Sequence, residues 1–181
     1  MTHYDLIILG TGSGNSIITP DFDDWNIALV EKGVFGGTCL NRGCIPSKMF
    51  VYAADVVEQA RHASALGVDL SIDGVRWPDI VSRVFDRIDP IAAGGEEYRV
   101  GLENVTVYKS HGRFTGPKTI QVDEEEITGD HIVIATGAEP FIPEINGLAQ
   151  AGFHTSDTIM RLPGVPERLA ILGGGYIATE M

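Results

Sequence analysis

The sequence predicts an α/β fold built on a parallel sheet, and three observations carry that prediction. The chain opens with a short apolar run, Tyr4 to Leu9, that leads into a glycine-rich turn. A second apolar run, Ile27 to Val30, ends at an acidic residue, Glu31. A run and turn of the same kind return near the end, from Leu169 to Gly175. Short apolar runs without alternation are typical of strands buried on both faces, as in parallel sheets.

The composition narrows the class of protein. The chain has 181 residues, 44% of them hydrophobic, which is enough for one domain or for one and part of another. With 13 Lys and Arg against 25 Asp and Glu, the formal net charge is -12, which disfavours binding to nucleic acid. No apolar run is long enough for a membrane-spanning helix, and the N-terminus lacks the cationic start of a secretory signal. We expect a cytoplasmic protein, where a permanent disulfide is unusual.

Two helices are predicted after the second strand. From about Ile45 to Leu66, apolar residues recur every three or four positions, and Gly67 is a natural stop. A second stripe predicts a helix from Trp77 to about Ile88. Pro90 and the pair Gly94-Gly95 should interrupt this helix before a further helical piece.

Beyond Val105 the chain changes to short strands separated by turns, namely VTVYK, GRFTG and TIQVD. Such hairpin-like runs predict a small antiparallel insert. The run from Ile132 to Ala135 reads as a buried strand again, and another is expected from Leu169 to Leu172.

The first strand and turn match the start of a dinucleotide-binding fingerprint. Gly10 permits the tight turn, and Gly12 lets the backbone approach a pyrophosphate, whose charge the following helix N-terminus would stabilise. Glu31 lies 21 residues after Gly10, close to the spacing expected for a carboxylate on ribose hydroxyls. Asn15 stands where a third glycine is usual.

The second copy of the device reads Gly173-x-Gly175-x-x-Ala178 and comes just before the last residue given, Met181. It predicts that a second Rossmann-like domain begins here. We therefore expect the chain to be an N-terminal fragment, with one domain over residues 1–147 and a linker and truncated second domain over 148–181.

The two cysteines, Cys39 and Cys44, are the only ones in the chain. A zinc site would need more ligands, but the chain has no other cysteine and its five histidines do not cluster. A structural disulfide across so short a loop would remove little entropy from the unfolded chain. Two independent thiols remain possible, but of these readings we favour a pair that cycles between dithiol and disulfide. In a regular helix their Cα atoms would be about 8–9 Å apart, which is too far for a disulfide. Gly43 and Pro46 make a distorted segment plausible.

The cysteine segment, GGTCLNRGCIPSK, closely resembles the redox-active segment of the flavoprotein disulfide reductases. The resemblance covers the whole chain in order, through GTGSG with Glu31, RFTG, IVIATG and GGGYIATEM. Four stretches are similar to one branch of this family, the mycothione reductases: GTGSGNS, KMFVYAADVV, RWPDIVSRVFDRIDPIA and HTSDTIMR. Arg42 departs from the pattern, because a small apolar residue is common there, and no role is assigned to it.

The resemblance implies a Rossmann-like FAD-binding domain with the small β insert, and it implies which residues bind the cofactors. Those expected to hold FAD are Gly10, Gly12, Ser13, Gly14, Glu31, Lys32, Gly37, Thr38, Cys44, Lys48, Gly112, Ala135, Thr136 and Gly137. The second fingerprint, through Gly173 and Gly175, would belong to the domain that binds NADPH.

The resemblance also implies catalytic roles. Cys39 would attack the substrate disulfide, and Cys44 would exchange electrons with the flavin ring. Lys48 would lie near the reacting edge of the flavin and pair with Glu180. Tyr176 would cover the flavin face where the nicotinamide docks.

By this resemblance, electrons would pass from NADPH to FAD, then to the Cys39–Cys44 disulfide, and finally to a low-molecular-weight disulfide such as mycothione. The intact protein would be a homodimer whose acid-base histidine comes from a C-terminal domain, so this chain alone should be inactive. The alternative within the family is another disulfide reductase, above all dihydrolipoyl dehydrogenase. A non-catalytic FAD-binding module and a flavin-free thiol sensor are the alternatives outside it.

Overall fold

The structure, a computed structural model, describes all residues from Met1 to Met181. Its contacts divide the chain into two compact units. Unit 1 comprises residues 1–41 and 89–139, and unit 2 comprises residues 42–88 and 140–181. The sheet lies in unit 1, and most of the helical residues lie in unit 2.

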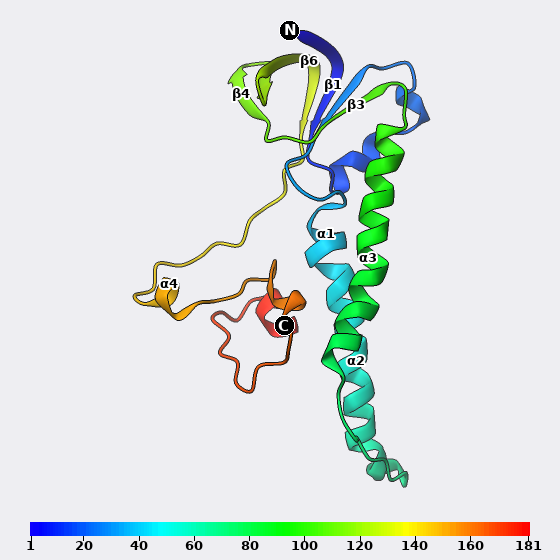
Figure 1. The fold of residues 1–181 in the computed structure, drawn as a ribbon, viewed down its shortest axis with the longest axis vertical. Helices are drawn as coiled ribbons and strands as arrows, with labels where there is room; N and C mark the ends of the chain where they lie inside the picture. Colours follow the sequence, from blue (N-terminus) through cyan, green and yellow to red (C-terminus); the bar gives the residue numbers. More distant parts are fainter. The chain divides into compact units, whose positions relative to one another are not determined.

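Unit 1 is built on one six-stranded sheet with the strand order β3-β2-β1-β6-β5-β4. Its strands are β1 (Thr2–Leu9), β2 (Ile27–Val30), β3 (Val105–Tyr108), β4 (Arg113–Gly116), β5 (Thr119–Val122) and β6 (Glu125–Ile134). The four strands β3, β2, β1 and β6 pair in parallel, whereas β5 pairs antiparallel with both β4 and β6. Figure 1 shows β3 and β4 at opposite edges of this sheet. The predicted α/β fold is confirmed.

One predicted strand lies elsewhere than expected. The segment VTVYK does not join the antiparallel insert, because β3 pairs in parallel with β2 in the register Ile27 to Val105. This pairing buries Val105 at the edge of the core. The insert is therefore made by β4, β5 and the first part of β6, which is paired with β1 on its other side.

Two apolar clusters cover the two faces of the sheet, as expected for strands buried on both sides. Neighbouring residues of β1 alternate between them, since Ile7 belongs to one cluster and Leu6 to the other. The first cluster includes Tyr4, Leu9, Ala28, Val30, Ile120, Val122 and Ile127. The second includes Ile8, Ile27, Leu29, Phe35 and Val105.

The turn after β1 is not followed by the predicted α-helix. Two short 3-10 helices take its place, η1 (Ser13–Ile17) and η2 (Pro20–Phe22). The physical reason is Pro20, which has no N–H donor and favours an extended conformation at the residue before it. Thr19 adopts that conformation, with φ −112° and ψ 171°. Ile17, Ile18, Phe22 and Trp25 pack against the second cluster in place of a longer helix.

The predicted first helix is confirmed as α2 (Cys44–His62), followed by η3 (Ala63–Leu66). Gly67 ends it in a left-handed conformation with φ 78°, as expected for a helix stop. A further short helix, α1 (Gly37–Arg42), precedes α2.

The predicted interruption of the second helix is wrong, because α3 (Trp77–Val100) runs through Pro90 and both glycines. Proline removes one backbone donor, but it does not remove the burial of the helix on either side. Val84, Phe85 and Ile88 are buried before it, and Ala92 is buried after it. This burial holds the helix together where local propensity would end it.

Aromatic contacts hold unit 2 together. Phe50 of α2 stacks on Trp77 with ring centroids 5.3 Å apart, and it also contacts Phe85 at 6.2 Å. The indole N–H of Trp77 donates to the carbonyl of Leu162 at 2.8 Å. The guanidinium of Arg161, at the end of η4 (Ile159–Arg161), lies 3.6 Å from the Phe85 ring centroid.

The predicted strand from Leu169 to Leu172 is not formed. A parallel strand needs a neighbour, and no strand of this chain pairs with that segment, whose apolar side chains are exposed. The helices α4 (Leu148–Ala151) and α5 (Tyr176–Glu180) lie on either side of it in the sequence. None of the helices combines the length and the apolar character needed to cross a membrane.

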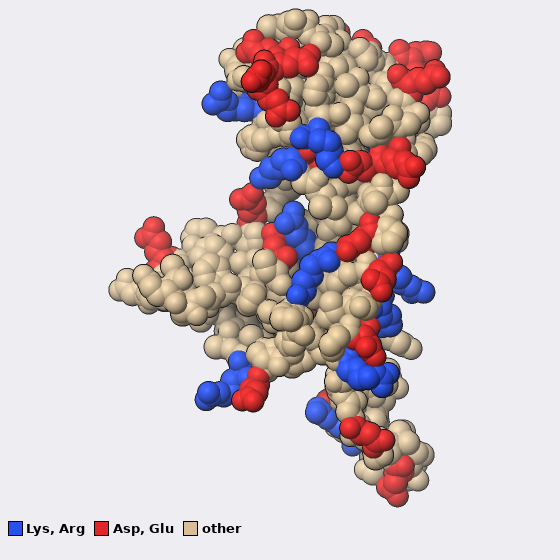
Figure 2. All heavy atoms as spheres, viewed as in Figure 1, with Lys and Arg blue, Asp and Glu red and all other residues tan.

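Acidic side chains gather over the antiparallel strands in Figure 2.

Candidate functional site

In unit 1, the residues that follow the parallel strands β1 and β6 are hydrogen-bonded to the carboxyl ends of their neighbours, β2 and β1. The N–H of Gly10, just after β1, donates to Val30 O at the end of β2 at 2.8 Å. The N–H of Ala135, just after β6, donates to Leu9 O at 2.8 Å. Ligands of α/β sheets bind outside the carboxyl ends of the strands, so this is where a dinucleotide is expected.

Two observations show that the turn after β1 requires glycine. Gly10 has φ 103°, and a Cβ there would lie 2.3 Å from the carbonyl oxygen of Ala135. A Cβ on Gly14 would lie 2.2 Å from the Cβ of Ala135. The predicted residues Gly10, Gly14 and Ala135 are thus brought together.

The start of α1 packs against the same turn. Gly37 has φ 64°, and a Cβ there would lie 2.6 Å from the Cα of Gly12. The N–H of Gly36 donates to Thr11 O at 3.2 Å, which ties the two backbones together. Cys39 lies two residues after Gly37 in the same unit, so the first cysteine is anchored to the glycine turn.

Glu31 is held by the turn rather than pointing freely away from it. Its Oε2 accepts from the N–H of Thr11 at 2.9 Å and from the hydroxyl of Thr11 at 2.7 Å. Its Oε1 accepts from the N–H of Gly33 at 2.8 Å. A carboxylate has about four lone-pair sites, so this half-buried group keeps acceptor capacity for a ribose hydroxyl.

The remaining predicted residues of unit 1 lie on the segments that surround the turn. Gly112 packs against Leu9, since a Cβ there would lie 3.1 Å from that side chain. Gly137 follows β6 with φ 72°. Ser13, Lys32, Thr38 and Thr136 are exposed, and Lys32 pairs with Glu139 at 3.2 Å.

These residues fit the diphosphate of a dinucleotide. Gly10, Gly12 and Gly14 carry no side chains, so a ligand can approach the backbone amides closely at these three positions. The lack of an α-helix after the turn departs from the expected diphosphate site.

Both cysteines are exposed thiols, with no disulfide between them in the structure. Cys39 belongs to α1, and Cys44 is the first residue of α2. Gly43 separates the two helices, with φ −137° and ψ −128°. No regular helix runs through both cysteines, so the helical spacing that would forbid a disulfide does not apply.

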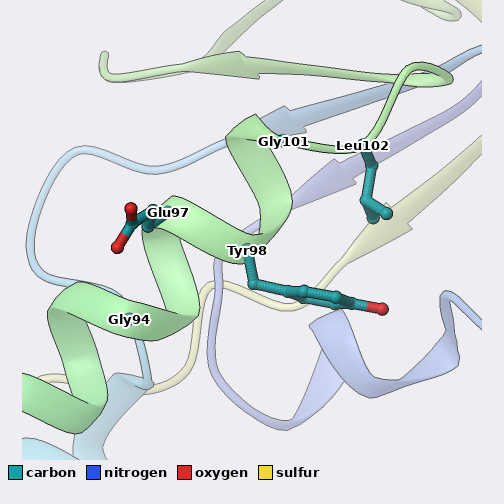
Figure 3. A pocket seen from close by; sticks show the side chains of 5 residues that line it. All are labelled: Gly94, Glu97, Tyr98, Gly101 and Leu102. Carbon is teal, nitrogen blue, oxygen red and sulfur yellow. The ribbon is translucent and has the colours of Figure 1, made fainter.

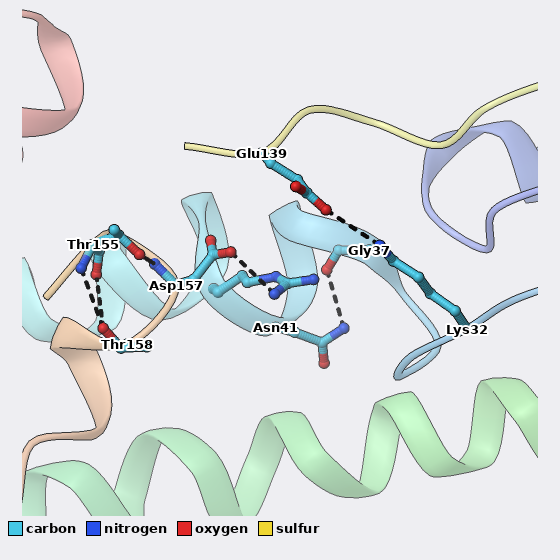
Figure 4. A network of polar contacts seen from close by, with 8 residues as sticks. Lys32, Gly37, Asn41, Glu139, Thr155, Asp157 and Thr158 are labelled. Carbon is cyan, nitrogen blue, oxygen red and sulfur yellow. Dashed lines mark hydrogen bonds and ion pairs between the residues drawn. The ribbon is translucent and has the colours of Figure 1, made fainter. Parts of the chain in front are cut away.

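The Asn41 side chain fixes the short α1 from within unit 1. Its amide donates to Phe35 O at 2.8 Å and to Gly37 O at 3.0 Å, the second bond being drawn in Figure 4. In unit 2, Arg42 pairs with Asp157 at 3.1 Å. The hydroxyl of Thr155 accepts from the N–H of Asp157 at 3.2 Å, and the N–H of Thr155 donates to the hydroxyl of Thr158 at 3.2 Å (Figure 4). Arg42, the residue that departs from the family pattern, therefore has an ion-pair partner.

The structure does not bring Lys48 and Glu180 into an ion pair, and both side chains are exposed. Tyr176 is 83% exposed at the start of α5. Gly173, with φ 125°, and Gly175 precede this helix. The predicted roles of these residues stay predictions.

Sequence reasoning missed two residues of unit 1. Thr11, which is 1% exposed, holds Glu31, and its position between the two fingerprint glycines was the available signal. Arg99, near the end of α3, is buried, and its Nη2 donates to the carbonyl of Asn15 at 3.0 Å. No pattern in the sequence distinguishes Arg99 from a surface arginine.

One pocket is lined by no residue of the glycine turn. It is lined by residues of the C-terminal part of α3 and of the turn that follows, as Figure 3 shows: Gly94, Glu97, Tyr98, Gly101 and Leu102. None of the predicted site residues lines it.

Residues 4–181 match the family model described as pyridine nucleotide-disulphide oxidoreductase. The chain is 50% identical to mycothione reductase from Mycobacterium tuberculosis over 186 aligned residues, covering 99% of this chain and 40% of that protein. It is 33% identical to mercuric reductase from Staphylococcus aureus, covering 98% of this chain and 33% of that protein.

Among solved structures, the chain is similar to the HOCl-induced flavoprotein disulfide reductase RclA from Escherichia coli. The TM-score is 0.81 at 27% identity, covering 98% of this chain and 38% of that one. The chain thus spans about 40% or less of the length of these relatives.

Proposed function

The chain belongs to the pyridine nucleotide-disulphide oxidoreductase family, and we propose that it forms the FAD-binding and thiol-bearing part of a disulfide reductase. The enzymes of this family use FAD and NADPH or a related pyridine nucleotide. One observation carries the proposal for this chain. The close approach of Gly37 to Gly12 anchors α1, and with it Cys39, to the turn that fits a dinucleotide diphosphate.

When bound, FAD would supply a two-electron carrier between the pyridine nucleotide and the cysteine pair. Residues Gly10 to Gly14 would bind its diphosphate through backbone amides, and Glu31 would accept from its adenosine ribose. Lys48 would lie near the flavin and pair with Glu180 in the complete protein, and Tyr176 would cover the nicotinamide position.

The chemistry of the cysteines balances over one cycle. Two electrons and two protons open the Cys39–Cys44 disulfide to a dithiol. The Cys39 thiolate then attacks a substrate disulfide, forming a mixed disulfide and releasing the first thiol. The Cys44 thiolate attacks the Cys39 sulfur, which releases the second thiol and restores the disulfide.

The substrate we propose is a low-molecular-weight disulfide, and the 50% identity to a mycothione reductase favours mycothione. On this proposal residues 1–147 form the FAD-binding domain, and residues 148–181 lead into an NADPH-binding domain. We further propose a cytoplasmic homodimer whose C-terminal domain supplies the acid-base histidine, so that the 181-residue chain alone does not turn over.

Trapping experiments test the roles of the cysteines in the complete protein. Reduced Cys44→Ser, incubated with mycothione, should retain one thiol adduct on Cys39, because the resolving thiol is missing. Cys39→Ser is the matched control and should form no stable adduct. Mass spectrometry of the intact protein and of its peptides measures both.

Steady turnover by Cys39→Ser, or equal adducts on both variants, would contradict the assigned roles. Faster oxidation of dihydrolipoamide with NAD⁺ than reduction of mycothione with NADPH would favour dihydrolipoyl dehydrogenase. A wild-type protein that takes up no FAD would leave only a flavin-free thiol protein.

A further inference from the structure

Arg99 is a buried cation without a carboxylate partner. The residue is 8% exposed, and none of the ion pairs of the structure includes it. Its contacts are the hydrogen bond from Nη2 to Asn15 O at 3.0 Å and the ring of Tyr98, 5.2 Å from its Cζ. Burial lowers the pKa of the guanidinium, which reflects the unfavourable transfer of its charge out of water.

The carbonyl that Arg99 binds belongs to the turn of the candidate site. Asn15 stands at the third position of the glycine fingerprint, within η1 (Ser13–Ile17). Its side-chain Oδ1 is buried and accepts no hydrogen bond. The buried Arg99 charge and the unpaired Asn15 Oδ1 therefore both lie at the segment Ser13–Ile17, which follows Gly12.

The same segment lacks the usual source of positive potential. A dinucleotide diphosphate is normally stabilised by the N-terminus of the α-helix after the glycine turn. Here the turn leads into a five-residue 3-10 helix and then to Pro20, so no helix of normal length points at the ligand. The charge of the diphosphate must be balanced in another way.

We propose that Arg99 is a positioning residue for FAD, which supplies positive potential from behind the turn in place of the missing helix. It acts through the backbone of Ser13–Ile17, which it holds by the bond to Asn15 O. The inference rests on the proposed function, since it takes the diphosphate of FAD as the anion. In the FAD-free protein the buried charge is uncompensated, whereas the diphosphate offsets it in the complex.

The test compares Arg99→Met with Arg99→Lys in the complete protein. Arg83→Met is the matched control, because Arg83 lies on the same helix and also donates to a backbone carbonyl, Met49 O at 2.7 Å, but is exposed. The measurements are the Kd of FAD at low and high salt and the melting temperature of the FAD-free protein.

We expect Arg99→Met to raise the Kd of FAD by about 10-fold to 100-fold, and to weaken its dependence on salt. The melting temperature of the FAD-free variant should stay the same or rise, because removing a buried charge that has no carboxylate partner offsets the loss of its hydrogen bond to Asn15 O. Arg99→Lys should restore much of the affinity, and Arg83→Met should bind FAD like the wild type.

Three results would overturn the inference. The first is an unchanged Kd in Arg99→Met. The second is a lower melting temperature of FAD-free Arg99→Met with a weakened Kd that Arg99→Lys shares in full, which indicates structural support alone. The third is a wild-type protein that binds no FAD, which refutes the proposed function as well and is seen before any variant is compared.

Discussion

The residues of the glycine turn are constrained by backbone contacts rather than by side-chain chemistry. Gly10 and Gly37 both have positive φ, and each would drive a Cβ into another backbone segment. Thr11 lies between the first two glycines and is buried, so its N–H and hydroxyl depend on Glu31 as an acceptor. The turn is thus held in its shape by contacts within the chain.

Gly10→Ala should destabilise the protein by about 1–3 kcal/mol, because alanine is strained at φ 103° and its Cβ would clash with Ala135 O. Urea denaturation of both proteins measures the free energy of unfolding. Gly94→Ala is the control, since a Cβ there meets nothing within 4 Å in the middle of α3. It should stabilise by about 0.5–1 kcal/mol. Equal effects of the two substitutions would contradict the close packing of the turn.

At the scale of elements, the two segments that contain a proline, the one after β1 and α3, differ in how much helix they form. Pro20 leaves only short 3-10 helices after β1, where 14 residues separate Gly12 from Ile27. Pro90 lies inside α3, which continues for ten residues beyond it. The difference follows from burial, because α3 has buried residues before and after its proline.

Pro90→Ala should therefore stabilise the protein by about 1–3 kcal/mol, since it restores a backbone donor to a helix that already exists. The exposed Ala93 of the same helix gives the reverse control. Ala93→Pro should destabilise by about 3 kcal/mol. Denaturant unfolding followed by far-UV circular dichroism reports both. A loss of stability in Pro90→Ala would show that the proline is favoured by its surroundings.

At the scale of the whole molecule, backbone hydrogen bonding is uneven. In β1, Leu6 to Leu9 lie between β2 and β6 and pair with both. The N–H groups of residues 163–174 donate to no backbone carbonyl. The apolar side chains of Leu169, Ile171 and Leu172 are about half exposed or more.

Hydrogen exchange should reflect this difference. Amides of Leu6 to Leu9 should exchange slowest in the chain, and those of residues 163–174 should exchange at nearly the unprotected rate. Mass spectrometry of peptides from the 181-residue chain measures both segments. In the complete protein, slow exchange at 169–172 would support a strand there in the proposed NADPH-binding domain. Fast exchange there would contradict it.

Much of unit 1 could be predicted from the sequence, because its features are local. The apolar runs predict β1, β2 and the end of β6, and the glycine spacing with Glu31 predicts the site at their carboxyl ends. The cysteine segment places the two thiols in one stretch of thirteen residues. These features need only chain periodicity, the φ of glycine and motif spacing.

The tertiary structure decided what depends on distant residues. It placed VTVYK beside β2, a pairing of Val105 with Ile27 that neither apolar run predicts by itself. It kept α3 continuous through Pro90, since packing outweighed propensity. It buried Arg99 against Asn15, 84 positions earlier in the sequence, and so gave a role to a residue that no pattern marks. Local sequence determined the elements and the motif, and long-range burial decided their partners.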